Sequence, residues 1–266
     1  MFDLNSFLTG FATILTLAIT TWCVSLFKRD VSIVDSLWPL LFLGAAVTYA
    51  ATVPQPGPRT TLVLVLVALW ALRLAGYLTW RNWDEPEDRR YQKIRRGNEP
   101  HFALKSLYLI FALQGTLAWI ISLPLLAAIA APRDLTVLDY AGVVLWAVGF
   151  GFESVADWQL ARFKGVATNR GRVMDQGLWR YTRHPNYFGD CCTWWGFYLF
   201  ALAAGGWWAA VGPLLMSFLL LRVSGVALLE RDIAERRPAY RDYILRTNAF
   251  FPGAQGRIDQ PHEHVE

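Results

Sequence analysis

The sequence predicts an all-α, polytopic membrane protein with seven transmembrane helices. The 266-residue chain is 55% hydrophobic, has a positive mean hydropathy and contains several long apolar runs. Crossing a hydrocarbon core of about 30 Å takes about 20 helical residues, and several of these runs reach that length. Basic residues, in contrast, gather in alternate connections, as they do in the cytoplasmic loops of membrane proteins.

The apolar runs place the seven helices in order along the chain. We expect them at residues 6–27, 31–51, 60–80, 104–131, 136–160, 187–204 and 207–230. The proline-rich stretch 54–58 separates the second helix from the third, because consecutive prolines break helices. Residues 1–252 are expected to form a single membrane domain. The tail from 231 has an amphipathic helical pattern, and 253–266 has the composition of a disordered end.

The distribution of charge predicts the orientation of these helices. Of the 25 lysines and arginines, only Arg59 and Arg133 fall in the connections that we place outside, and nearly all others fall in the alternate connections and the tail. The positive-inside rule therefore places the N-terminus outside and the C-terminus in the cytoplasm. Asp3 stands where a cleavable signal would carry basic residues, so we expect the first helix to be retained.

Composition argues against several other classes of protein. Cys23, Cys191 and Cys192 lie in apolar segments without the spacing of a metal site, and we expect no metal. The net charge of +4 is explained by the membrane topology, and no feature indicates nucleic-acid binding. The polar residues gather at one membrane face, whereas transporters often break their helices near mid-membrane, which argues against a transporter or lipid-binding scaffold.

A set of polar residues on different predicted helices falls in the cytoplasmic leaflet. Asp35 lies about one turn into the second helix, or about 6 Å at 1.5 Å per residue. Tyr77 lies near that level on the third helix, and Arg73 is one turn deeper. Charged groups inside a membrane are costly and usually functional, so this convergence predicts a cavity open to the cytosol. A simple Asp35–Arg73 ion pair is the structural alternative.

A second set of polar residues opens the sixth helix and closes the fifth. Residues 183–190 combine two cations, an amide, a phenol and a carboxylate, and they include Arg183, His184 and Tyr187. Glu153 and Asp157 are four residues apart and share one helical face, where they can accept ribose or amide donors from a cofactor. Pairing with Arg73, Arg162 or Lys164 is the alternative that needs no ligand. We expect His184 to contact a cofactor and not to act as the catalytic acid.

The cytoplasmic connection 161–186 is rich in arginine. Arginine binds phosphate oxygens well because its donors are planar and permanently charged. Such density is also common in cytoplasmic loops for reasons of topology alone. No GxGxxG or P-loop pattern is present, so a Rossmann-type cofactor domain is not expected.

Several of these segments resemble one known family. Residues 177–190, together with 80–82, 87–91 and 237–243, are similar to steroid 5α-reductases and their bacterial homologues. The similarity is specific over about 150–252 and weaker over 30–95. It implies seven transmembrane helices, NADPH as cofactor, and reduction of the carbon–carbon double bond of a 3-oxo-Δ4 steroid. The bacterial branch further implies a multi-pass protein of the inner (cytoplasmic) membrane.

The resemblance also implies roles for individual residues. Asn186 and Asp190 match the Asn and Glu of the family's Asn-x-x-Gly-Glu motif, with Asp replacing Glu near the nicotinamide. Arg172 matches an arginine that contacts phosphate, and Asp157 matches an acidic residue of the fifth helix. The expected cofactor contacts are Arg81, Glu153, Asp157, Arg162, Lys164, Asn169, Arg172, Arg183, His184, Asn186, Tyr187 and Asp190.

A catalytic pair follows from the same comparison. The family uses a carboxylate on the second helix and a tyrosine on the third. Asp35 and Tyr77 fit these positions by their depth in the membrane. Spacing along the sequence alone would instead align Trp70 with the family's tyrosine. A protonated Asp35, with Tyr77, would stabilise negative charge on the carbonyl oxygen of a lipophilic enone. The enone could be a steroid, a polyprenoid or a fatty compound that enters from the membrane lipids.

Another membrane enzyme class shares part of this pattern. Isoprenylcysteine carboxyl methyltransferases resemble the chain in an Arg-His-Pro-x-Tyr-x-Gly element and in the tail, and they use S-adenosylmethionine. Asp35, the loop 87–91 and the seven crossings favour the reductase.

Overall fold

The structure is a computed structural model that describes residues 2–223, 225–226, 230, 233 and 238–256. All regular elements among these residues are helical, as expected. The helices that correspond to the first three predicted segments are α1 (Leu4–Lys28), α2 (Ile33–Thr52) and α3 (Pro58–Arg81). The fourth segment is a continuous run made of α5 (Phe102–Ser106), a π-helical stretch (Leu107–Ala112) and α6 (Leu113–Ile121), followed by α7 (Leu123–Ile129).

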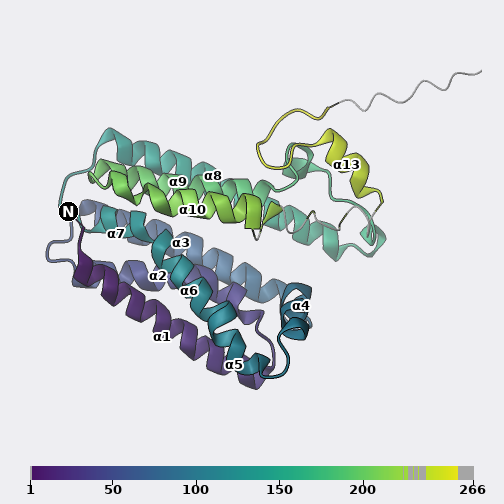
Figure 1. Ribbon diagram of the computed structural model, residues 1–266. Coiled ribbons are helices and arrows are strands. Elements are labelled where there is room, and N and C mark those ends of the chain that lie inside the picture. Colours follow the sequence, from purple (N-terminus) through teal and green to yellow (C-terminus); the bar gives the residue numbers. More distant parts are fainter. Residues whose placement is uncertain (1, 224, 227–229, 231–232, 234–237, 257–266) are drawn as a thin grey trace, which may run out of the picture. The chain divides into compact units, whose positions relative to one another are not determined.

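The later helices also match their predicted segments. They are α8 (Val137–Gly165), α9 (Pro185–Ala203) and α10 (Val211–Phe218), the last flanked by short helical turns that extend it to Trp207–Val223. Of two further polar helices, α4 (Arg89–Gly97) was not predicted, whereas α13 (Tyr240–Arg246) lies in the tail from 231, where an amphipathic helix was expected. Residues 231–232 and 234–237 of that tail lie outside the described residues. Figure 1 shows the course of the chain through these elements.

Five helical segments are long and apolar enough to cross a membrane. Within the described residues they are Leu4–Lys28, Ile33–Thr52, Pro58–Arg81, Phe102–Ile121 and Val137–Gly165. Trp207–Val223 is a shorter apolar helix. These helices carry many exposed large hydrophobic side chains, such as Leu72 and Val144, which is the surface expected of helices in lipid. The length and apolar composition of these helices are those of a helical membrane protein.

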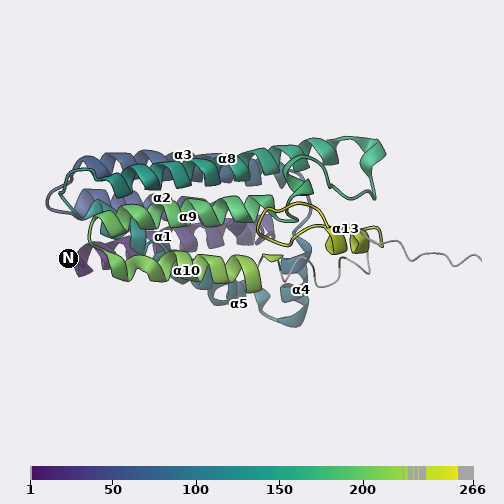
Figure 2. The same ribbon diagram turned by 90° about the horizontal axis from the view of Figure 1, so that it is seen from above.

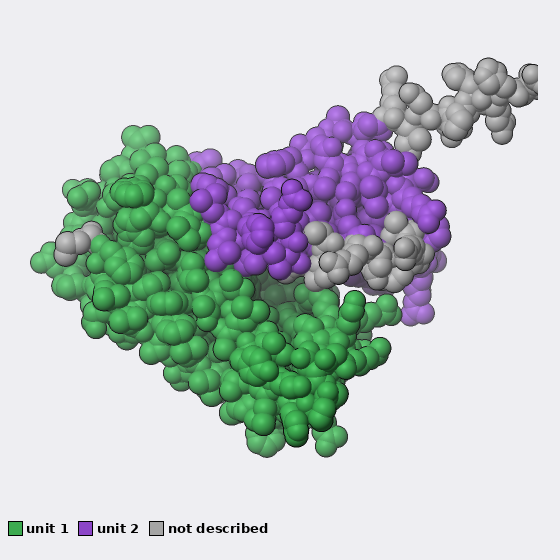
Figure 3. All heavy atoms as spheres, viewed as in Figure 1, with its two compact units in different colours: residues 1–143, 196–213 green, residues 144–195, 214–266 purple. Residues whose placement is uncertain are grey.

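The chain divides into two compact units (Figure 3). One unit comprises Met1–Val143 and Gly196–Pro213, and the other comprises Val144–Trp195 and Leu214–Glu266. The boundaries fall inside α8, α9 and α10, so no linker separates the units along the chain.

In the first unit, α2 lies between α1 and α3, while α6 packs on α1 and α2 (Figures 1 and 2). Asp3 caps α1 by accepting a hydrogen bond from the Ser6 amide at 3.0 Å. Pro58 occupies the first turn of α3, where its missing N–H costs no hydrogen bond. Tyr49 of α2 is fully buried, and its hydroxyl shares a 2.7 Å hydrogen bond with Ser122.

Arg59, which the sequence places in an outside connection, lies in the first turn of α3. It is fully buried and binds Asp139 of α8 through Nε at 2.6 Å and Nη2 at 2.9 Å. Its Nη2 also donates to the carbonyl of Asp134. Arg133, in contrast, is exposed.

In the second unit, α8 and α9 meet with their backbones in close approach. A Cβ on Gly149 would lie 2.5 Å from the carbonyl oxygen of Gly189, and a Cβ on Gly189 would lie 2.5 Å from the Glu153 amide nitrogen. Small residues allow membrane helices to approach in this way. The contact fixes Glu153 beside the first turns of α9, where Asn186 and Asp190 lie.

The segment after α13 returns to the loop that precedes α9. The Arg183 amide donates to the Asn248 carbonyl at 2.9 Å, and the Gly253 amide donates to the Tyr181 carbonyl at 3.0 Å. Residues 253–256, which the sequence assigned to a disordered end, thus make defined contacts, whereas 257–266 lie outside the described residues.

Candidate functional site

Asp35 is the centre of a polar cluster in the first unit. It lies in the first turn of α2, and its Oδ2 accepts a 2.7 Å bond from Nη2 of Arg90. Its Oδ1 accepts a 2.6 Å bond from the hydroxyl of Tyr91. The Tyr91 oxygen in turn accepts from Nε2 of Gln114 at 3.2 Å. Asp35 is thus paired with Arg90 of α4 and not, as the sequence alternative held, with Arg73.

Helix α4 reaches Asp35 because its N-terminal segment is bound to the turn between α1 and α2. The Val31 amide donates to Oε1 of Glu87 at 3.1 Å, and the Asp88 amide donates to the Ser32 hydroxyl at 2.8 Å. Arg95 pairs with Glu87 at 2.6 Å. The side chain of Asp88 caps α4 by accepting from the Arg90 amide. These bonds hold Arg90 and Tyr91, which contact Asp35, beside the first turn of α2.

The electrostatics of α4 match this arrangement. Burial opposes the charge on Arg90, but the neighbouring Asp35 and Asp88 outweigh burial and raise the pKa of the guanidinium. Burial and the charge of Asp35 both raise the pKa of the Tyr91 phenol, which is only 6% exposed. Tyr91 is therefore protonated at neutral pH and can donate a hydrogen bond.

Tyr77 and Arg81 lie in the same unit, at the end of α3. The Arg81 guanidinium lies 5.8 Å from the centre of the Tyr77 ring, and that ring contacts Trp80 at 6.2 Å between centroids. Trp80 and Trp83 are both about two-thirds exposed. Tryptophans at the end of a membrane helix are typical of the interfacial region.

In the second unit the structure brings together Asn186 and Asp157, which were both predicted to contact the cofactor. Nδ2 of Asn186 lies 3.4 Å from Oδ1 of Asp157, which is a long hydrogen bond. Glu153 and Asp157 are 3% and 5% exposed, and Asp190 is 8% exposed. The carboxyl groups of α8 and the start of α9 thus form a buried polar region within this unit.

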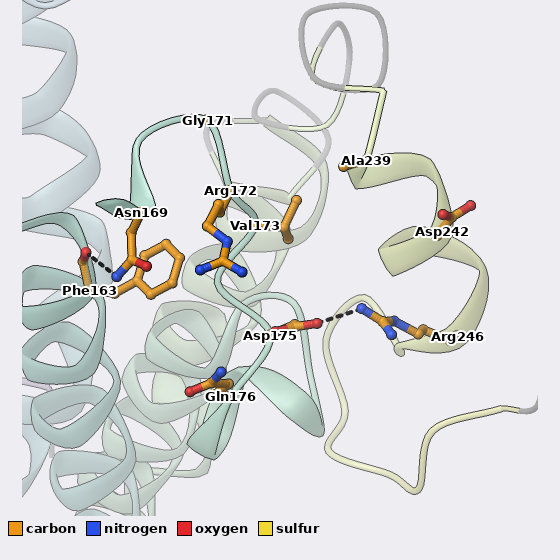
Figure 4. A pocket seen from close by; sticks show the side chains of 10 residues that line it. All are labelled: Phe163, Asn169, Gly171, Arg172, Val173, Asp175, Gln176, Ala239, Asp242 and Arg246. Atoms are coloured by element: carbon orange, nitrogen blue, oxygen red, sulfur yellow. Dashed lines mark hydrogen bonds and ion pairs between the residues drawn. The ribbon is translucent and has the colours of Figure 1, made fainter. Parts of the chain in front are cut away.

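A cavity of about 530 Å³ lies in the second unit, next to the loop between α8 and α9 (Figure 4). Its walls include Asn169, Gly171, Arg172, Asp175 and Arg246. Gly171 adopts a φ of +82°, a left-handed conformation that glycine permits, and no atom lies within 4 Å of where its Cβ would be. The cavity is large enough for a ligand of nucleotide size.

The polar lining of this cavity comes from two distant segments. Arg246 of α13 pairs with Asp175 at 2.5 Å, and Nδ2 of Asn169 donates to the Phe163 carbonyl at 3.0 Å (Figure 4). A neighbouring cavity of about 320 Å³ shares Asn169 and is lined by Arg162, whose guanidinium lies 5.5 Å from the Trp158 ring. Three of the predicted cofactor contacts therefore line these cavities: Arg162, Asn169 and Arg172.

The predicted residues Arg183 and His184 form part of a different cluster. Arg183 binds Glu230 through two bonds of 2.7 and 2.8 Å and donates to the carbonyls of Ile244 and Thr247. Nε2 of His184 lies 3.0 Å from the same carboxyl, and the His184 ring stacks on Tyr187. These contacts tie the start of α9 to the tail.

This cluster stabilises the charged form of the Glu230 carboxyl group. Burial would raise its pKa, but hydrogen bonds from His184 and Arg183 outweigh burial and lower the pKa to about 2. The pKa of Arg183 is raised by the same partner despite burial. Lys164 is exposed at the end of α8.

Sequence reasoning missed the roles of Arg90, Tyr91, Gln114 and Arg246. The loop 87–91 was recognised only as part of a family resemblance, and no period or motif indicates that it binds Asp35. Gln114 is the one amide side chain in a long apolar run, which is a signal that could have identified it.

In the described part of the chain, no group of three or more His, Cys, Asp or Glu side chains is arranged to hold a metal ion.

Comparison with known proteins adds a family. A family model described as a protein of unknown function (DUF1295) matches residues 21–247. An uncharacterized protein of Schizosaccharomyces pombe is 26% identical over 296 residues, which cover 98% of this chain and 83% of the yeast protein. No solved structure matches the chain at a significant level.

Proposed function

This chain belongs to the DUF1295 family, and from its polar clusters we propose that it is an integral membrane reductase that uses NADPH. Its substrate is a lipophilic enone such as a 3-oxo-Δ4 steroid, and the reaction reduces the carbon–carbon double bond. The observation that carries the proposal is the cavity lined by Asn169 and Arg172, because the sequence predicts that both residues contact the cofactor.

The side chains of the second unit offer the hydrogen-bond donors and acceptors that a nicotinamide dinucleotide requires. Arg172 supplies a planar, permanently charged donor for phosphate oxygens beside the open backbone of Gly171. The buried carboxyl groups of Glu153, Asp157 and Asp190 can accept hydrogen bonds from ribose hydroxyls or from the carboxamide. When bound, the nicotinamide would supply the hydride of the reaction.

The first unit contains hydrogen-bonding groups that suit the carbonyl oxygen of an enone. Reduction of an enone builds negative charge on its carbonyl oxygen, and a fixed hydrogen-bond donor at that oxygen lowers the barrier. Asp35 lies in such a donor cluster at the end of an apolar helix. Exposed apolar side chains on the membrane helices are consistent with an acceptor that is dissolved in lipid.

The proposed topology has seven crossings, which include α9 and Trp207–Val223 in addition to the five long apolar helices. The N-terminus lies outside, and the C-terminus and the cavity face the cytoplasm of a bacterial inner membrane. The basic cytoplasmic connections support this orientation.

The test is anaerobic incubation of the purified protein with NADPH and a panel of lipophilic enones, followed by mass analysis of the products. A product two mass units heavier than its enone, with matching loss of the NADPH absorbance, supports the proposal. No reduction of any enone, together with transfer of a methyl group from S-adenosylmethionine, would replace it with the methyltransferase alternative.

A further inference from the structure

One side of helix α4 carries only basic residues. The sequence of this helix contains arginines and a lysine but no carboxylate. Arg89, Lys93 and Arg96 follow one another at spacings of four and three residues, so they lie on the same side of the helix. All three are exposed, whereas Tyr91, about half a helical turn further round, is buried. The basic side of α4, formed by Arg89, Lys93 and Arg96, therefore points away from the core of the first unit.

The other two cations of α4 have partners inside the first unit. Arg90 pairs with Asp35 at 2.7 Å and with Asp88 at 3.0 Å. Arg95 pairs with Glu87 at 2.6 Å. These pairs neutralise the three carboxylates on the inner side of the helix.

The basic side of α4, in contrast, has no ion pair among the described residues. The other acidic residues of this connection, Asp84, Glu85 and Glu99, lie before or after α4 in the chain. Three exposed cations without a protein counterion attract an anionic ligand.

Helix α4 is fixed to the end of the membrane helices of its unit. Besides the bonds of Glu87 and Asp88 to the turn between α1 and α2, Nη2 of Arg95 donates to the Arg29 carbonyl at 3.3 Å. Figures 1 and 2 show α4 near α5, at one end of the first unit. The basic side is thereby held at the level where the apolar helices α1 and α3 end.

Exposed aromatic side chains mark the same level. Phe27, in the last turn of α1, is 89% exposed, and Trp80, in the last turn of α3, is 66% exposed. Exposed cations follow each of them directly in the chain, Lys28 in one case and Arg81 in the other. Amphipathic aromatic rings and basic residues at helix ends are typical of the headgroup region of a membrane. This end of the first unit therefore has the surface of a protein that meets lipid headgroups.

We infer that the basic side of α4 binds the headgroups of anionic phospholipids. Arg89 and Arg96 donate to phosphate oxygens through planar, permanently charged groups, and Lys93 adds a third positive charge between them. Basic clusters on helices beside a membrane attract anionic lipids in this way. The inference does not rest on the proposed reductase function.

Bound lipid has a consequence for the rest of the first unit. The same helix holds Asp35 through Arg90 and Tyr91 on its inner side. A ligand that binds the folded protein stabilises it, so anionic lipid on the outer side should stabilise α4 in its contact with α2.

The experiment titrates the purified full-length chain in a neutral detergent with phosphatidylglycerol or phosphatidylcholine, and native mass spectrometry counts the bound lipids. The wild type should bind the anionic lipid about tenfold or more tightly than the zwitterionic one. Each basic residue beside an anionic surface contributes about fivefold. The triple variant Arg89→Gln/Lys93→Gln/Arg96→Gln should therefore bind phosphatidylglycerol about 10- to 100-fold more weakly.

Two control variants test whether position and charge are both needed. Arg170→Gln/Arg180→Gln/Arg241→Gln removes the same charge from exposed residues of the second unit and should keep most of the affinity. Arg89→Lys/Arg96→Lys keeps the charge of α4 and should also keep it. Thermal unfolding provides a second measurement. Without lipid, the α4 triple variant should unfold at the wild-type temperature, and phosphatidylglycerol should raise that temperature only for the wild type and the controls.

The outcomes decide between an anionic lipid and other ligands. Equal loss of affinity in the α4 triple variant and in the second-unit variant would show that net charge alone attracts the lipid, and it would overturn the inference. Unchanged lipid binding with weaker NADPH binding in the α4 triple variant would assign the basic side to nucleotide phosphates instead. Loss of lipid binding with unchanged NADPH affinity supports the lipid site, whether or not the protein reduces an enone.

Discussion

Arg59 and Asp139 form an ion pair in which neither side chain is more than 1% exposed. It joins the first turn of α3 to the first turn of α8, at the end of the first unit where the α2–α3 connection also lies. Charges that are fully buried are tolerated only when each has its partner, because an unpaired charge at low dielectric is costly.

Replacing Arg59 by methionine should therefore destabilise the protein by about 3–5 kcal/mol, since Asp139 would stay buried without its counterion. Thermal unfolding in detergent measures the loss. The double variant Arg59→Met/Asp139→Leu should regain most of it. Arg133→Met, at an exposed arginine of the same region, is the control. An equal effect of Arg59→Met and Arg133→Met would contradict the structural role of the pair.

Gly189→Ala should separate α8 from α9. The added Cβ would lie 2.5 Å from the Glu153 amide nitrogen, which is far inside van der Waals contact, so the helices must move apart. We expect a loss of about 1–3 kcal/mol, as for other overpacked contacts. Gly151→Ala is the matched control, because no atom lies within 4 Å of its added Cβ. Equal unfolding temperatures for the two variants would show that α8 and α9 do not approach each other this closely at Gly189.

The Glu230 cluster predicts a dependence of stability on pH. The pKa of Glu230 is lowered from 4.5 to about 2 in the folded protein, so its contribution is fully present above about pH 4.5 and is lost as the pH falls toward 2. Unfolding of the wild type and of Glu230→Gln should be compared between pH 7 and pH 3. The difference between them should shrink as the pH falls. A constant difference would mean that Glu230 is not bound by Arg183 and His184.

Arg172→Ala should weaken NADPH binding by about 10- to 100-fold, which corresponds to loss of one charged hydrogen bond of about 1.5–3 kcal/mol. Equilibrium binding followed by nicotinamide fluorescence measures it. Arg180→Ala, an exposed arginine of the same connection that does not line the cavity, is the control. Equal affinity of the two variants would remove the cavity from the cofactor site.

Asp35→Asn should keep NADPH affinity and lose about 100-fold or more in turnover. Asn has one acceptor oxygen in place of two, so it cannot serve Arg90 and Tyr91 together as Asp35 does. Steady-state kinetics with progesterone gives the turnover, and nucleotide binding is measured on the same preparation. Full activity in this variant would show that Asp35 does not act in the reaction.

The membrane helices could be predicted from the sequence because their signal is local. Segments such as Pro58–Arg81 are long, apolar and bounded by proline or polar residues, and the backbone must be helical wherever it is surrounded by lipid. The cluster at Asp35 could not be predicted in the same way. Its partners come from α4, a polar helix whose position depends on bonds from Glu87 and Asp88 to the α1–α2 turn.

The cavity was predicted in part for a similar reason. Asn169 and Arg172 lie close together in sequence, so one loop brings both to its wall. Arg246 reaches the same wall from the tail through its pair with Asp175, and such a contact between distant segments leaves no pattern in the sequence. The depth argument considered only residues on the apolar helices, so it did not reach Tyr91, whose hydroxyl donates to Asp35.

The return of the tail along the loop before α9 bears on how the protein is engineered. The family match ends at residue 247, but the Thr182 hydroxyl donates to the Phe250 carbonyl at 2.9 Å, and the Gly253 amide bonds to Tyr181. A fluorescent reporter fused at the family boundary would strip these bonds from the loop that carries Arg183. Fusion beyond Gly256 leaves them intact, so topology reporters and affinity handles belong there.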